Sequence, residues 1–233
     1  MATTRPENHF ERKVVIKFIE DYFTGPDADP DLTLIYNRGF SDTVSAIVGR
    51  YLAQSRSQAA LKAAHEVQVA ANADADAKLR TLSMHTLMNR GPEALAELER
   101  AWGGQTRSEL AASNHARQVA AVDKLFVAVD AGLVLPVSET HLAELRVANK
   151  VMSDAVNEVI RCAAAAKADT EALAALLPTF DAGWVRFSAT AKELLGDKLG
   201  QLVPDLTPFR RGGARASEAE AGGEADNDGA NGE

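Results

Sequence analysis

The feature that most constrains the fold is a long stretch without proline, between Pro30 and Pro92. Apolar residues recur along it at helical spacing, and Gly49 is a weak breaker. One helix over residues 42–88 would be roughly 70 Å long at about 1.5 Å per residue. Because that length exceeds a compact domain of this size, we expect either a break near residues 72–76 or a long helical arm.

Prolines, glycines and capping residues divide the remainder of the chain into further helices. Two T-x-x-E sequences, Thr4–Glu7 and Thr106–Glu109, are typical capping boxes at helix starts. The sequence of segment 31–40 is compatible with either a short helix or an extended segment. The expected helices cover residues 7–23, 92–102, 106–131, 138–167, 170–177 and 181–195.

Strand signals are nearly absent, so the expected fold class is all-α. The best strand candidate, 127–137, is interrupted by a glycine, a proline and an aspartate. We expect a bundle of six or seven helices with one long helix or arm, over a domain of residues 1–211 with a possible sub-boundary near 91–105. Residues 212–233 are rich in glycine, alanine and acids and are expected to be a disordered acidic tail.

Composition and charge exclude several classes of protein. The hydrophobic fraction of 46% argues against a wholly disordered chain. The net charge is −8, but the 24 bases and 27 acids outside the tail leave only −3. A body so nearly neutral is unlike a protein whose main task is to coat a polyphosphate backbone.

The same sequence argues for a cytoplasmic protein without a membrane span. It has no apolar signal core at its start and no apolar run of the roughly 18–20 residues that would cross a bilayer. The one cysteine, Cys162, excludes a disulfide within the chain. Abundant alanine and an excess of arginine over lysine favour a bacterial or phage source.

A heptad pattern in the segment 139–177 marks a candidate helix-packing interface. Asn149 is the polar residue of this seam, and such an asparagine can fix helix register and oligomeric state. The seam predicts helix packing either inside the chain, as the buried stripe of a bundle, or between copies. Its members are Leu142, Leu145, Asn149, Met152, Val156 and Val159.

The alanine-rich stretch 53–77 is a second candidate for helix packing. Alanine lets helices approach closely but buries little apolar area, at about 25 cal/mol per Å2. The stretch therefore needs a neighbour, either as a thin layer of the bundle or as a surface for a partner. We favour a partner.

Basic residues suggest an alternative, contact with nucleic-acid phosphates. Four of them recur every four residues near the start of the chain and would form one stripe on a helix. Acids share that helix, so a solvated face is the competing interpretation. The candidate phosphate contacts are Arg5, His9, Lys13 and Lys17, with Arg210 and Arg211 near the other end of the chain.

No catalytic motif stands out, so we expect no enzyme and no catalytic, cofactor-binding or metal-ligating residue. The sequence has no G-x-G-x-x-G, P-loop or G-x-S-x-G pattern. His141 and Glu144 share a helix face and could ligate a metal if other helices contributed, but an exposed pair is the simpler interpretation. Cys162 lies among alanines and is expected to be an inert core thiol.

These patterns favour a non-enzymatic helical assembly or interaction protein that acts through coiled-coil-like packing. The expected partner is a second copy of the chain or another protein. The alternative is a nucleic-acid-associated adaptor that uses the basic stripe, and an enzyme with a site assembled from distant residues is a third hypothesis.

Overall fold

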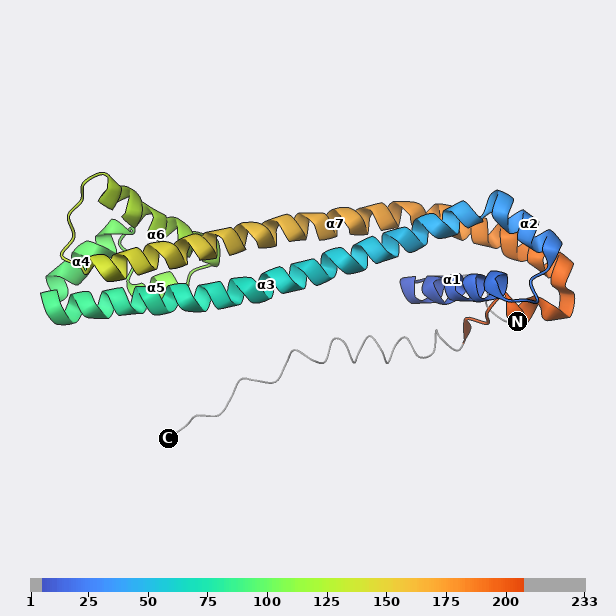
Figure 1. Cartoon of the computed structure of the whole chain (residues 1–233), viewed down its shortest axis with the longest axis horizontal. Coiled ribbons are helices and arrows are strands. Elements are labelled where there is room, and N and C mark those ends of the chain that lie inside the picture. Colours follow the sequence, from blue (N-terminus) through green and yellow to red (C-terminus); the bar gives the residue numbers. More distant parts are fainter. Residues whose placement is uncertain (1–5, 208–233) are drawn as a thin grey trace, which may run out of the picture. The chain divides into compact units, whose positions relative to one another are not determined.

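The computed structural model describes residues 6–207, and every regular element in that range is helical (Figure 1). This confirms the all-α prediction. The α-helices are α1 (His9–Thr24), α2 (Pro30–Gly39), α3 (Ser41–Arg90), α4 (Pro92–Ala101), α5 (Arg107–Ala111), α6 (His115–Asp130) and α7 (Glu139–Leu195), followed by the 3-10 helix η1 (Gly196–Gln201).

The chain divides into two compact units. The first unit joins described residues 6–52 to residues 171–207, and the second consists of residues 53–170. The sub-boundary considered near 91–105 falls inside the second unit. The predicted tail, 212–233, lies outside the described residues.

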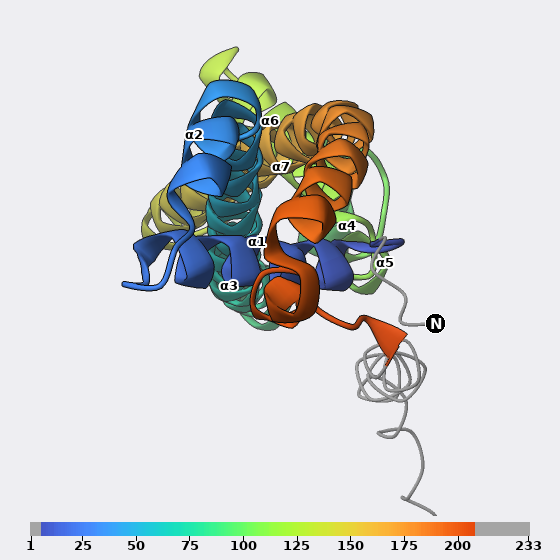
Figure 2. The ribbon, with the colours of Figure 1, turned by 90° about the vertical axis from the view of Figure 1, so that its right-hand side faces the viewer.

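The core of the first unit combines aromatic rings with aliphatic side chains, and α1, α2 and the ends of α3 and α7 enclose it (Figure 2). Phe23 stacks on Tyr36 with ring centroids 4.2 Å apart. Phe40 lies between Phe180 and Phe187, at 5.6 and 5.4 Å. Rings of this size bury much apolar area per residue, so this unit does not depend on small side chains for its cohesion.

One buried ion pair ties α1 to α7 in the first unit. The guanidinium of Arg12 donates from Nε and Nη2 to the two carboxylate oxygens of Asp181, at 2.9 and 2.6 Å. This two-point geometry is the strongest form of such a pair, and the hydrogen bond to Asp181 raises the pKa of Arg12.

Leucines and Trp102 form the main core of the second unit, among α3, α4, α5, α6 and α7. Trp102 is almost fully buried, and its indole nitrogen donates to the carbonyl oxygen of Gln105 at 2.7 Å. A thinner layer continues from this core, made mostly of alanine: Ala71, Ala75, Val119, Ala148, Met152 and Ala155.

The helix starts agree with the sequence in part. Segment 30–39 is a helix, because the carboxylate of Asp29 accepts from the backbone N–H groups of Asp31 and Leu32. The Thr106–Glu109 capping box is confirmed. Asn8 caps α1 by accepting from the backbone N–H of Glu11, and Thr4 of the predicted Thr4–Glu7 box lies outside the described residues.

Of the two alternatives for residues 42–88, the structure has the long helix, since α3 is continuous through 72–76. Other predicted boundaries are wrong. The segment expected as one helix over 106–131 is two, because Asn114 caps a new helix and accepts from the backbone N–H of Arg117. The stops expected at 167 and 177 do not occur, and α7 continues through Pro178 to Leu195.

Candidate functional site

Helices α3 and α7 pair in opposite directions along the second unit. Three contacts mark their register: Gln54 Nε2 to Thr170 Oγ1 at 3.2 Å, Lys78 Nζ to Glu144 Oε2 at 3.2 Å, and the rings of His85 and His141 at 4.7 Å between centroids. Residue numbers rise along α3 as they fall along α7, so the pair is antiparallel (Figure 1).

The heptad seam faces the interior of the second unit. Leu145, Asn149 and Met152 are buried, at 1%, 2% and 0% exposure. Leu142 and Val156 are half-buried against the leucine and alanine clusters, and Val159 is half-buried as well. The seam is therefore occupied by contacts within the chain, and a free surface must be sought elsewhere.

Helix α6 covers one side of the α3–α7 pair. The amide of Asn149 donates to the carboxylate of Asp123 on α6 at 2.7 Å. The amide of Gln118 on α6 donates to the carboxylate of Asp76 on α3 at 2.6 Å. Asn149, the polar residue of the seam, thus fixes the position of a third helix beside the pair.

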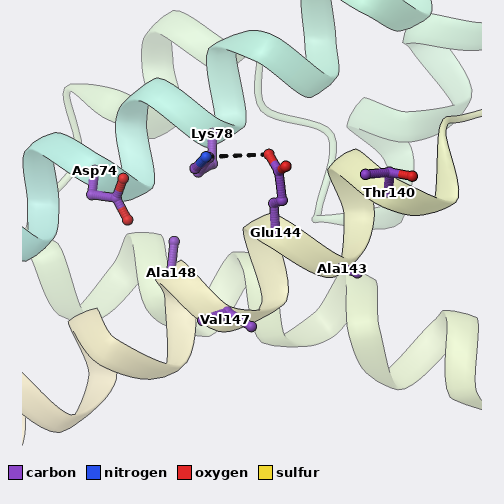
Figure 3. Close-up of a pocket in the computed structure, with 7 residues that line it drawn as sticks. All are labelled: Asp74, Lys78, Thr140, Ala143, Glu144, Val147 and Ala148. Atoms are coloured by element: carbon purple, nitrogen blue, oxygen red, sulfur yellow. Dashed lines mark hydrogen bonds and ion pairs between the residues drawn. The ribbon is translucent and has the colours of Figure 1, made fainter.

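An open groove lies on another side of the same pair (Figure 3). It encloses about 580 Å3. Val147 stands in it at 66% exposure, and Lys78 and Glu144 form their ion pair across it. The lining residues are Asp74, Lys78, Thr140, Ala143, Glu144, Val147 and Ala148.

A second hollow of about 320 Å3 continues the groove along α3 and α7. Successive residues of an α-helix turn by about 100°, so the α3 residues of both hollows fall within an arc of about 100° and their α7 residues within about 140°. Val151, 51% exposed, occupies the same arc between them. The lining residues of the second hollow are Ala60, Ala63, Ala64, Val67, Ala155, Glu158 and Cys162.

Charges at the second hollow are already paired within α7. Arg161 Nε donates to Glu158 Oε2 at 2.8 Å, and this contact lowers the pKa of Glu158 to about 2. Cys162 is buried, and its burial raises the pKa of the thiol, with the hydrogen bond to Glu158 acting in the same direction. A thiol kept protonated is a poor nucleophile, so Cys162 offers no reactive group to this end of the groove.

The structure places the described part of the basic stripe beside Tyr51. The Nδ1 atom of His9 lies 3.0 Å from the Tyr51 hydroxyl, and Lys13 Nζ lies 5.1 Å from the centre of that ring. Burial, with Arg12 and Lys13 nearby, lowers the pKa of His9 below 6.5. Lys17 pairs with Asp21 at 3.3 Å. Arg5, Arg210 and Arg211 lie outside the described residues.

A further hollow, of about 780 Å3, lies in the first unit beside the Arg12–Asp181 pair. Its other lining residues come from α7 and include Leu177, Pro178 and Arg186. Because the Arg12 guanidinium is committed to Asp181, this hollow does not present Arg12 as a free anion-binding group.

Two negative findings limit the chemistry of residues 6–207. In this range no group of three or more His, Cys, Asp and Glu side chains is arranged to hold a metal ion. None of the helices described has the length and apolar content needed to cross a bilayer.

Comparison of the chain with protein-family models, with curated proteins and with solved structures finds no match. Its function must therefore be inferred from its own geometry. The sequence did not single out Val67 and Val147, which line the two hollows, or Val151, which lies between them on the same side of α7. Their signal is that β-branched apolar residues recur outside the heptad seam, at i and i+4 in the case of Val147 and Val151.

Proposed function

We propose that this protein is a non-enzymatic helical assembly protein whose second unit binds a second copy of itself through the α3–α7 groove. The observation that carries the proposal is the row of exposed valines on a side of the pair that α6 does not cover. Val67, Val147 and Val151 are 59%, 66% and 51% exposed. Aliphatic side chains in one continuous stripe are typical of an interaction surface.

The shape of the groove supports a second copy as the occupant. Val147 projects at one end, and the small residues Ala60, Ala63 and Ala64 line the other beside Val67. A two-fold axis across the middle of the groove would place the valine end of each copy on the alanine end of its partner. Such an interface is self-complementary, because the same contact is made twice.

The charges at the two ends are compatible with the same arrangement. One end carries the Lys78–Glu144 pair and the other the Arg161–Glu158 pair. With Asp74, the first end offers one cation and two anions to the opposite end of a second copy, and the other end offers one cation and one anion. Neither end presents a single sign of charge that would repel its counterpart.

The available area sets the expected strength of the contact. The groove runs along residues 60–78 of α3, roughly 27 Å at about 1.5 Å per residue, and is about two helix diameters wide. Two copies would then bury roughly 1,100 Å2 in total, close to the lower limit for a specific interface. We therefore expect a dimer that forms reversibly and depends on protein concentration.

Light scattering after size exclusion tests this proposal on the full chain. We expect twice the chain mass of 24.8 kDa at low and at moderate salt, since apolar burial is not screened. The double variant Val147→Asp, Val151→Asp should be a monomer with unchanged helical content.

The matched control is Val127→Asp on α6, a valine that is 70% exposed and does not line the groove. This variant should remain dimeric. A wild-type protein that is monomeric at high concentration would overturn the proposed dimer, and so would a dimer that survives the double substitution.

A further inference from the structure

We propose that His85 and His141 form a binding site for a divalent transition-metal ion such as zinc. The site lies within the second unit and joins α3 to α7. This inference goes beyond the proposed assembly function and does not depend on it.

The two imidazole rings are placed as a chelating pair. Their centroids are 4.7 Å apart, and the ring planes meet at 74°. A zinc ion bonds an imidazole nitrogen at about 2.0–2.1 Å, so two rings on one ion lie at a centroid separation of about 5 Å. The centroid separation of the pair therefore matches that of two imidazoles that share one ion.

The hydrogen bonding of the rings points to a missing ligand. The Nδ1 atom of each ring is buried, and neither has a hydrogen-bond partner in the protein. Buried polar atoms normally have a partner, and an unpaired one calls for an explanation, such as a bound ion. Here two such atoms occur on rings that touch each other.

The surroundings define the coordination that the site can offer. Glu144, one turn beyond His141, is held by Lys78 at 3.2 Å. Among the described residues no further carboxylate or thiol completes a set of three ligands. The protein would supply two imidazole nitrogens, and water would supply the remaining positions, so binding should be reversible.

The donor atoms select the class of metal. Neutral imidazole suits zinc, nickel and copper, whereas calcium and magnesium prefer oxygen ligands. A metal held by one residue from each helix would cross-link α3 and α7. Because a preformed pair exists only in the folded chain, binding would stabilise the fold.

Calorimetric titration of the full chain with zinc chloride, after removal of metal by EDTA, tests the site. We expect one zinc per chain and a rise in the thermal unfolding midpoint. Magnesium chloride should produce neither effect. In nuclear magnetic resonance spectra, zinc should shift the ring signals of His85 and His141 and leave those of His65 unchanged.

Two variants and one matched control decide the assignment. His85→Gln and His141→Gln should each weaken zinc binding by roughly ten-fold or more, because one imidazole cannot chelate. His65→Gln, an exposed histidine on the same helix α3, should bind as the wild type does. Circular dichroism verifies that each variant remains folded.

Equal zinc binding by the wild type, His85→Gln and His141→Gln would overturn the proposal, since the zinc would then be bound elsewhere. Absence of zinc binding to the wild type at millimolar concentration would overturn it too. If a variant fails to fold, the wild-type spectra decide, and ring signals of His85 and His141 that zinc leaves unchanged would exclude the site.

Discussion

At the scale of single residues, Gly183 and Gly49 differ in how closely other side chains approach them. Both lie in helices of the first unit. A Cβ atom on Gly183 would lie 2.6 Å from the ring of Phe40, whereas at Gly49 no atom lies within 4 Å. Phe40 is held between Phe180 and Phe187 and has no room to withdraw.

Gly183→Ala should lower the free energy of unfolding by roughly 1–3 kcal/mol, because the added methyl group overpacks the aromatic core. Gly49→Ala is the matched control. It should raise the free energy of unfolding by roughly 0.5–1 kcal/mol, because alanine favours a helix and meets no neighbour here. Urea denaturation of both variants measures the difference, and a stabilised Gly183→Ala variant would contradict the packing described.

Residue types alone do not reveal such contacts. The role of Asn149 as a polar residue in a buried seam could be predicted from the heptad spacing. Its hydrogen-bond partner, Asp123, could not, because it belongs to a different helix. The contact of His141 with His85 was missed for the same reason, and the sequence offered only the local neighbour Glu144.

At the scale of elements, α7 shows that packing can override a helix breaker. Pro178 has no N–H to donate, and its ring crowds the carbonyl group of Ala174, so the sequence predicts a stop. The helix nevertheless continues, because Leu173, Phe180 and Trp184 on either side of the proline are buried in one core. Their burial outweighs the loss of one hydrogen bond.

Pro178→Ala should raise the free energy of unfolding by roughly 1–2 kcal/mol, because it restores the helical hydrogen bond and removes the crowding. The side chain of Pro178 is exposed, so little packing is lost. Pro92→Ala is the control, since Pro92 occupies the first turn of α4, where a proline is tolerated. That variant should lose no more than about 1 kcal/mol. A clear destabilisation of Pro178→Ala in thermal unfolding would refute this explanation.

Element types were more predictable than element ends. Periodicity and capping residues predicted helical structure correctly outside the open segment 31–40, and the Thr106–Glu109 box marked the start of α5. The break at Asn114 was missed because this N-cap residue of α6 lies within a helical pattern of apolar residues that continues on both sides. Helix α3 stays continuous through its alanine-rich stretch because that stretch packs against α7. The sequence of α3 alone does not reveal these contacts.

At the scale of the whole molecule, the charge distribution bears on the nucleic-acid alternative. The body of the chain is close to neutral. On α1 the lowered pKa of His9 leaves that residue largely uncharged at pH 7, and Lys17 is paired with Asp21. The described part of the stripe therefore presents less positive charge than its sequence suggests.

We expect no detectable binding of a labelled random-sequence DNA duplex, even at low salt, in a fluorescence anisotropy titration of the full chain. Salt-dependent binding that the double variant Lys13→Glu, Lys17→Glu abolishes would contradict this expectation and support the adaptor. Lys192→Glu, an exposed lysine on α7, is the control for a general change in charge.

The candidate groove could be predicted only in part. The sequence indicated that α3 and α7 are surfaces for helix packing, and it proposed the heptad seam as the interface. Which side of the pair remains uncovered depends on the position of α6, and that position follows from hydrogen bonds between distant residues such as Gln118 and Asp76. Such contacts leave no periodic signal in a single sequence.

The division of the chain into units has a consequence for its synthesis. The aromatic core of the first unit needs Phe180, Trp184 and Phe187, which the ribosome adds only after the 118 residues 53–170. At about 5–20 residues per second, α1 and α2 would wait on the order of ten seconds with apolar side chains uncovered. The second unit, residues 53–170, can fold before the first unit is complete. Until then, the nascent helices α1 and α2 would need a chaperone to shield their apolar side chains.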